Sequence, residues 1–226
     1  MGYCSRSQAA ILIRDGRVTV NGRVVRDPEN PVRLSQDRMA VDGQPLDKKA
    51  AIYLAMNKPR GVVTTASDEK GRATVYDFLE PGLPWIGPVG RLDKASEGLL
   101  LLTNDSEWAA NITEPSRHLD KKYHVQVDCV ADGDLLMRIT RGESLRAKDA
   151  RFLRQGVKNS WLEITLDEGK NRQIRRLFQA LEVKVLRLVR VSIGPLELGN
   201  LKKGSMRRLT PEEKKAMDLA MRALPR

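Results

Sequence analysis

A charged tetrapeptide that runs into a short apolar stretch constrains this chain more than any other feature of its sequence. Residues 90–93, Gly-Arg-Leu-Asp, follow a Gly-Pro-Val turn signal at 87–89 and precede four consecutive leucines at 99–102. A continuous apolar run of this length, bounded by turn residues, is typical of a strand buried on both faces. We therefore expect Arg91 and Asp93 to be held at the edge of a rigid core strand. The tetrapeptide alone does not separate a functional pair from a turn cap or a surface ion pair.

The charge balance points to a polyanionic partner. Lys and Arg number 40 against 29 Asp and Glu, a formal net charge of +11, and the basic residues are spread along the chain. An excess of this size favours nucleic acid as the partner, with a solubilising basic surface as the alternative. The length of 226 residues predicts one main domain plus a small module.

Several classes of site have no signature in the sequence. Cys4, Cys129, His118 and His124 are the only cysteines and histidines, and their spacing does not suggest metal ligands, so we expect neither a metal site nor a disulfide. No phosphate-binding glycine loop or serine elbow is present, and we expect no cofactor. Because we find no membrane-spanning apolar run and no signal peptide, we expect a cytoplasmic protein that does not bind membranes.

The N-terminal stretch predicts a small basic module. Residues 5–13 predict a helix, and Asn21-Gly22 between residues 17–20 and 23–25 is a strong hairpin signal. The candidate RNA contacts here are Arg6, Arg14 and Arg17. Residues 2–22 resemble the small RNA-binding module shared by a small-subunit ribosomal protein and tyrosyl-tRNA synthetases, in which a further helix precedes this motif. We therefore expect a module at 1–48 that lacks its first helix, a joint at 47–49, and a main domain at 50–226.

The remaining pattern predicts an α+β fold with a large, mostly antiparallel sheet and flanking helices. Strands are expected at 51–56, 123–129, 160–166 and 185–192, interleaved with helices without a regular βαβ rhythm. Asp105 is expected to cap one helix, Asp132 or Asp134 another, and residues 210–213 form a capping box for the last.

A second informative stretch spans residues 167–178. Asn171 is the expected N-cap of a helix whose two faces differ in character. The apolar face carries Ile174, Leu177, Phe178 and Leu181, and the opposite face carries Arg172, Arg175, Arg176 and Gln179. Three arginines without an acid on the same face suggest carboxylate or phosphate partners elsewhere, although a solvated basic face is the common alternative.

Four motifs, taken together and in order, resemble those of one enzyme family, the ribosomal RNA pseudouridine synthases of the small-subunit-A type. They are residues 56–61 (Met-Asn-Lys-Pro-Arg-Gly), 90–105 (Gly-Arg-Leu-Asp to Thr-Asn-Asp), the Lys-Tyr pair at 122–123, and 168–178 (Glu-Gly-Lys-Asn-Arg-Gln-Ile-Arg-Arg-Leu-Phe). The match extends over roughly the whole chain. The resemblance implies isomerisation of a uridine in ribosomal RNA, with the catalytic fold of that family.

The resemblance also implies roles for individual residues. Asp93 is the essential carboxylate, a nucleophile toward the ribose or the base, and Arg175 pairs with it and keeps it ionised. Tyr123 stacks on the uracil, and Arg91 takes the place of the flipped nucleotide. Arg172 and Arg176 are expected to contact RNA, and Lys58 is expected to brace the first motif.

Two other classes of function remain open at this stage. A non-catalytic rRNA-binding or ribosome assembly factor would also explain the charge and the N-terminal module. A glycoside hydrolase with paired carboxylates is a weaker hypothesis, because Glu97 and Asp105 show no evident partnership with Asp93. Our expectation is a monomeric enzyme acting on ribosomal RNA, the large-subunit RNA in preference to the small, with assembly intermediates as further partners.

Overall fold

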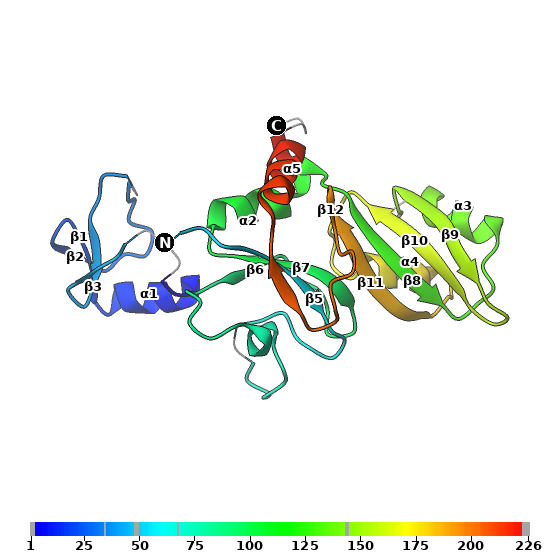
Figure 1. Ribbon diagram of the computed structural model, residues 1–226, viewed down its shortest axis with the longest axis horizontal. Helices are drawn as coiled ribbons and strands as arrows, with labels where there is room; N and C mark the ends of the chain where they lie inside the picture. Colours follow the sequence, from blue (N-terminus) through cyan, green and yellow to red (C-terminus); the bar gives the residue numbers. More distant parts are fainter. Residues whose placement is uncertain (1–2, 34, 48–49, 67, 143–144, 223–226) are drawn as a thin grey trace.

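The computed structural model describes residues 3–33, 35–47, 50–66, 68–142 and 145–222 (Figure 1). Two β-sheets organise these residues, one with four strands and one with nine. The small sheet lies with the N-terminal helix at one end of the molecule, and the large sheet with its helices makes up the rest (Figure 1). The expected α+β class is confirmed.

The N-terminal module forms from local signals. Helix α1 (Arg6–Arg14) begins with a capping box in which Ser5 and Gln8 satisfy each other's backbone N–H groups. Strands β1 (Val18–Val20) and β2 (Arg23–Val25) are joined by Asn21-Gly22, which has φ values of 51° and 78° as a type I′ turn requires. Strands β3 (Met39–Val41) and β4 (Gln44–Pro45) complete the order β2-β1-β3-β4. The predicted helix and hairpin are confirmed. Gly2 and residues 48–49 of the joint predicted at 47–49 lie outside the described residues.

The large sheet is antiparallel except at one pairing. Its main path runs β13-β5-β7-β11-β8-β10-β9, while β6 pairs with β7 and β12 with β11. Only β7 and β11 run parallel among the pairings of the described strands. The strands are β5 (Tyr53–Lys58), β6 (Gly87–Val89), β7 (Glu97–Thr103), β8 (Lys121–Val127), β9 (Asp149–Gln155), β10 (Ser160–Leu166), β11 (Val185–Ile193), β12 (Leu196–Glu197) and β13 (Met206–Arg208).

Helices flank this sheet, and three of them begin at capping residues expected from the sequence. They are the 3₁₀ helices η1 (Val75–Phe78) and η2 (Pro115–Arg117) and the α-helices α2 (Ser106–Thr113), α3 (Gly133–Arg141), α4 (Gln173–Ala180) and α5 (Pro211–Arg222). Asp105 caps α2, and Asp132 rather than Asp134 caps α3. Thr210 and Glu213 form the expected capping box of α5.

Strand β7 is buried on both faces, as its run of leucines predicts. All seven of its residues are buried. Leu99 and Leu101 pack in the core that α2 and α5 cover, whereas Leu100 and Leu102 pack in the core that includes α3 and α4. Because successive side chains of a strand point to opposite faces, one strand supplies both cores. The loop that ends at β7 is therefore anchored at the centre of the molecule.

Candidate active site

A cleft of about 820 Å³ brings together most of the side chains singled out from the sequence. Several separate parts of the chain line it, namely the loop before β7, the end of α2 with η2, strands β8 and β11, and the segment that leads into α4. Its lining includes Arg91, Asp93, Tyr123, Arg172 and Arg175. Arg91 and Arg175, which are 84 positions apart in the sequence, thus share one cavity.

Asp93 lies in the loop before β7 with its side chain 33% exposed. Its carboxylate Oδ2 lies 3.8 Å from Nη1 of Arg172. Among the described residues, Arg172 is the cation that forms an ion pair with Asp93 within 4 Å. The backbone N–H of Ser96 donates to the Asp93 carbonyl at 2.9 Å and closes the loop as a turn. The carboxylate is therefore accessible from the cleft and faces a guanidinium.

The pairing expected between Arg175 and Asp93 is not what the structure shows. Arg175 donates from Nη2 to the Ala95 carbonyl at 3.0 Å, so it holds the backbone of the Asp93 loop, and Arg172 takes the ion pair. Burial, followed by the neighbouring charge of Arg172, lowers the pKa of Arg175, while the charge of Asp93 opposes that shift. Arg175 is near enough to Asp93 to act on it through its charge.

The start of α4 explains this difference. Arg172, not Asn171, is the N-cap residue, and it makes no side-chain capping bond. It adopts a left-handed conformation with φ of 49°, which is uncommon for a residue other than glycine. The predicted Asn171 cap is therefore wrong, and Arg172 lies outside the helix, so it does not share a helical face with Arg175. Ile174, Leu177 and Phe178 are buried as the pattern predicts.

Tyr123 lies on β8 opposite Arg190 of β11 and Ile164 of β10. The residue is 9% exposed, and it contributes both to the hydrophobic core and to the wall of the cleft. Core packing fixes the ring, while its position in the wall leaves it available for contact with a ligand. The structure thus places Tyr123 in the wall of the cleft.

The other residues predicted to contact RNA lie partly in the cleft lining and partly outside it. Arg91 is an exposed residue of the cleft lining, and Arg176 is exposed on α4 and does not belong to the lining. Arg6, Arg14 and Arg17 lie on the N-terminal module, away from the cleft lining. Arg17 pairs with Asp42 at 2.5 Å.

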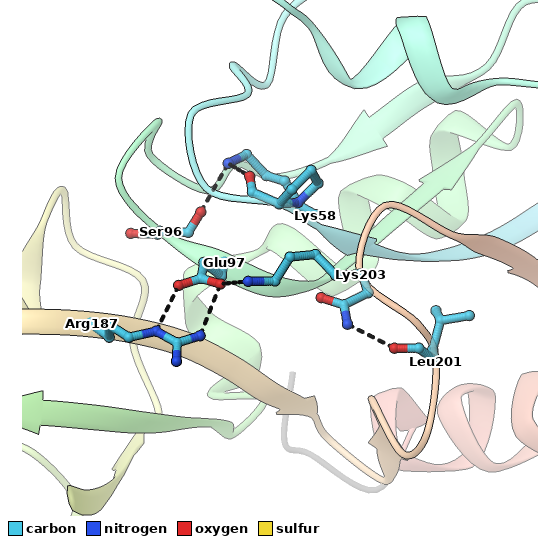
Figure 2. A network of polar contacts seen from close by, with 8 residues as sticks. Lys58, Ser96, Glu97, Arg187, Leu201 and Lys203 are labelled. Atoms are coloured by element: carbon cyan, nitrogen blue, oxygen red, sulfur yellow. Dashed lines mark hydrogen bonds and ion pairs between the residues drawn. The ribbon is translucent and has the colours of Figure 1, made fainter.

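Lys58 binds the backbone of the Asp93 loop. It is fully buried at the end of β5, and its ammonium donates to the carbonyls of Pro59, Asp93 and Ser96 at 3.1, 3.2 and 2.9 Å. Figure 2 shows the bond to Ser96. Burial lowers its pKa to about 8, although the charges of Asp93 and Glu97 act in the opposite direction. The expected bracing role of Lys58 has a physical basis in these three bonds.

Sequence reasoning missed three charged residues around the cleft. Lys121 and Arg190 line it, and Arg190 is 6% exposed with its Nε donating to the Leu99 carbonyl at 2.7 Å. Burial, then the charge of Arg190, lowers the pKa of Lys121. Glu97 is 2% exposed directly after the Asp93 loop. A lone acid beginning an apolar strand was the available signal for Glu97, because a buried carboxylate needs partners.

The balance of charge in the cleft suits a polyanion. The cationic members of the lining are Arg91, Lys121, Lys170, Arg172, Arg175 and Arg190, and the anionic members are Asp93, Asp167 and Glu168. A cavity with such an excess of cationic side chains can attract a phosphate backbone. An ionised carboxylate in such a place can act as a nucleophile without a metal ion.

The described part of the chain contains neither a cluster of metal ligands nor a membrane-spanning helix. No three His, Cys, Asp or Glu side chains in this part of the chain are grouped so that they could hold a metal ion. No helix among the same residues is both long and apolar enough to cross a membrane.

Comparison with known proteins assigns the family. Residues 52–180 match the RNA pseudouridylate synthase family, and residues 1–39 match the S4 domain family. The chain is 38% identical over 223 residues to ribosomal large subunit pseudouridine synthase B of Bacillus subtilis, covering 96% of this chain and 91% of that protein. It is 36% identical over 210 residues to the protein of the same name from Yersinia pestis, covering 87% of this chain and 65% of that protein.

A solved structure shows the same relationship. A crystal structure of a pseudouridylate synthase matches 94% of this chain and 94% of its own, with 31% sequence identity and a TM-score of 0.66. The family match includes Lys58, Asp93, Tyr123 and Arg175. The chain belongs to the RNA pseudouridylate synthase family and carries an S4 domain at its N-terminus.

Proposed function

We propose that this enzyme converts one uridine of large-subunit ribosomal RNA to pseudouridine, with Asp93 as the nucleophile. One observation carries the proposal, namely that the Asp93 carboxylate opens into a basic cleft beside Tyr123, Arg172 and Arg175. The large-subunit substrate is supported by the names of the relatives from Bacillus subtilis and Yersinia pestis.

The reaction is an isomerisation, so its atoms balance without a cofactor. The Asp93 carboxylate attacks the ribose or the base, the glycosidic C–N bond breaks, and the uracil turns within the cleft. Carbon 5 then bonds to the ribose, and the bond to Asp93 breaks so that the carboxylate is released. The hydrogen on carbon 5 leaves as a proton, and the freed ring nitrogen gains one. A carboxylate nucleophile divides a difficult substitution into two easier steps. Tyr123 stacks on the uracil during this rotation.

Arginines supply the electrostatic part of the mechanism. Arg172 faces the carboxylate at 3.8 Å and forms an ion pair with it. Arg175 holds the Ala95 carbonyl, which fixes the loop that presents Asp93. This division of work replaces the single Arg175 ion pair expected from the resemblance.

RNA reaches the cleft only if the target nucleotide leaves its stack. Extrusion of a base costs a few kcal/mol, and contacts between the basic surface and the phosphates offset that cost. We assign Arg91 at the cleft rim to the space that the flipped nucleotide leaves, and Arg176 to the flanking backbone. Arg6, Arg14 and Arg17 on the S4 module extend this contact to RNA away from the target.

The proposal also covers the setting in which the enzyme works. Its RNA partner is ribosomal RNA in the cytoplasm, either free or within ribosome assembly intermediates. The complete cleft comes from one chain, and we propose that the enzyme acts as a monomer. A two-domain organisation, with the module at 1–48 and the catalytic domain at 50–226, is part of the same proposal.

The decisive experiment maps pseudouridine in ribosomal RNA from a strain that lacks this gene. Carbodiimide-dependent primer extension should show the loss of one stop in large-subunit RNA, restored by the wild-type gene but not by Asp93→Asn. If no pseudouridine is lost, or if Asp93→Asn restores it, the catalytic assignment is wrong. Rescue of a growth or assembly defect by Asp93→Asn, without modification, would instead favour a non-catalytic assembly factor.

A further inference from the structure

The large sheet consists of two halves that meet at one short pairing beside the cleft. The β7 half contains β13, β5 and β7, and the β8 half contains β11, β8, β10 and β9. Their junction is the parallel pairing of β7 with β11, whose register covers Glu97 opposite Val189 and Gly98 opposite Arg190. The two halves are therefore joined within the residues that directly follow the Asp93 loop.

Each half supplies a different part of the cleft. Asp93 precedes β7 and belongs to the β7 half, whereas Tyr123 lies on β8. Arg172 and Arg175 lie at the start of α4, which follows β10 in the chain and packs in a core to which both halves contribute, among them Leu100 of β7 and Val125 of β8. The distance between the carboxylate and these three side chains consequently depends on how the halves are placed.

Glu97 joins these halves through its side chain. The residue is 2% exposed, and both of its carboxylate oxygens are engaged (Figure 2). Arg187 of β11 donates from Nε and Nη2 to the two oxygens at 3.1 Å each, and Lys203 donates to Oε2 at 2.5 Å. Burial would raise the pKa of Glu97, but the bonds from Arg187 and Lys203 lower it below its usual value. The group is an anion clamped by two cations.

Lys203 adds a third segment to this junction. It lies in the connection from β12 to β13, which the backbone ties to β5. In that connection the Gly204 N–H donates to the Asn57 carbonyl at 2.8 Å, and the Asn57 side chain donates to the Leu201 carbonyl at 2.7 Å. Glu97 thus connects its own strand to β11 and to the segment that returns to β5.

Glu97 supplies the carboxylate of this junction, beside two bonds to the backbone: Arg190 donates to the Leu99 carbonyl at 2.7 Å and Arg175 to the Ala95 carbonyl at 3.0 Å. Gly98 has φ of 101°, and a Cβ atom placed there would lie 2.2 Å from the Arg190 carbonyl oxygen, so no side chain fits at this position. On the other side, Lys58 binds the carbonyls of Asp93 and Ser96 and fastens the loop to β5 of the same half. Lys58 holds the loop within its half, and Glu97 holds that half against the other.

We propose that Glu97 is a positioning residue, whose carboxylate, clamped by Arg187 and Lys203, sets Asp93 against Tyr123, Arg172 and Arg175 across the junction of the two half-sheets. It acts through the backbone, since it does not belong to the cleft lining. This inference rests on the proposed role of Asp93 as nucleophile. A misplacement of about 1 Å in a reacting group can cost about 100-fold in rate.

The test compares Glu97→Gln with a control variant, Glu213→Gln. The control also removes a carboxylate that is paired with an arginine through two hydrogen bonds. Glu213 accepts two bonds of 2.6 Å from Arg207 and lies outside the cleft lining. On a transcript of the RNA segment mapped in the deletion strain, we expect Glu97→Gln to lower kcat by about 100-fold with KM little changed. We expect Glu213→Gln to lose thermal stability while its kcat stays at the wild-type value.

A conservative pair separates positioning from simple stabilisation. Arg187→Lys keeps a cation beside Glu97, whereas Arg187→Met removes it. If the two variants have the same melting temperature, the kcat of Arg187→Lys should still be higher than that of Arg187→Met. If Glu97→Gln does not fold, Lys203→Met leaves the Arg187 pair in place and should show a smaller loss of kcat in the same direction. An unchanged kcat in the folded variant, or a rise of KM alone, would overturn the proposal.

Failure of this inference can be told apart from failure of the proposed mechanism. If Asp93→Asn retains activity, the nucleophile assignment fails, and the reason for the inference fails with it. If Asp93→Asn is inactive while Glu97→Gln is fully active, the nucleophile stands and only the positioning role is wrong.

Discussion

The N-terminal module and the large sheet differ most in how deeply they bury their side chains. Among the described residues of the module, only Val41 is buried, and α1 has no buried residue. In the large sheet, every residue of β7 is buried. The module is held mainly by turns, caps and strand pairing, and it leaves its arginines at the surface, whereas the sheet fixes its charged groups by packing around them. We therefore expect the module to control RNA affinity and the sheet to control chemistry.

The largest expected difference between the two regions is in stability. Leu100→Ala in β7 should lower the free energy of unfolding by about 2–5 kcal/mol, because it opens a cavity where the side chain is fully buried. Ile11→Ala on α1, where the residue is 56% exposed, should change it by no more than about 0.5 kcal/mol. Urea denaturation followed by tryptophan fluorescence measures both. Equal losses would show that the module has a core of its own.

The next effect concerns catalysis and compares two adjacent arginines. Arg175→Gln should lower kcat by about 100-fold, because the cleft loses a preorganised charge and the bond to the Ala95 carbonyl. Arg176→Gln, on the exposed side of α4, is the matched control and should affect mainly KM. Single-turnover kinetics on the mapped RNA segment separates the two. Similar losses of kcat for both variants would contradict the distinction between cleft and surface.

A smaller effect is the pH dependence of stability that comes from Lys58. Its pKa is about 8 in the folded protein against 10.5 for an unperturbed lysine, so the unfolded chain binds more protons between these values. Stability should therefore rise with pH in this window, relative to Lys58→Met, by on the order of 2 kcal/mol. The measurement is the free energy of unfolding of both proteins from pH 7.5 to 10.5. A difference that does not vary with pH would mean that Lys58 titrates normally.

The smallest effect is expected from the module arginines. Arg6→Gln and Arg14→Gln should each weaken RNA binding a few-fold and reduce the salt dependence by about one released counterion, with kcat unchanged. Arg17→Gln should have less effect, since Asp42 already pairs with that guanidinium. Filter binding at several salt concentrations provides the measurement. A loss of kcat in any of the three would show that the module acts on the chemistry.

Local sequence signals predicted the secondary structure where a short stretch contains the whole cause. The Asn21-Gly22 turn, the Asp105 cap and the Thr210 capping box are all confirmed, because each depends on atoms within a few residues. The Asn171 cap failed although asparagine is a favoured cap residue. There Arg172 adopts a left-handed backbone conformation, and its guanidinium faces Asp93, which lies 79 positions earlier in the sequence.

The sequence by itself determined the α+β class, the doubly buried strand at 99–102 and a family resemblance that comparison with known proteins confirmed. Only the tertiary structure decided that Asp93, Tyr123, Arg172 and Arg175 share one cleft, and that Arg172 rather than Arg175 pairs with the carboxylate. It also gave Glu97 its two cations. The physical reason is that periodicity and capping act within a turn or two of the chain. Distances between side chains far apart in sequence depend instead on how two half-sheets pack across Glu97 and Gly98.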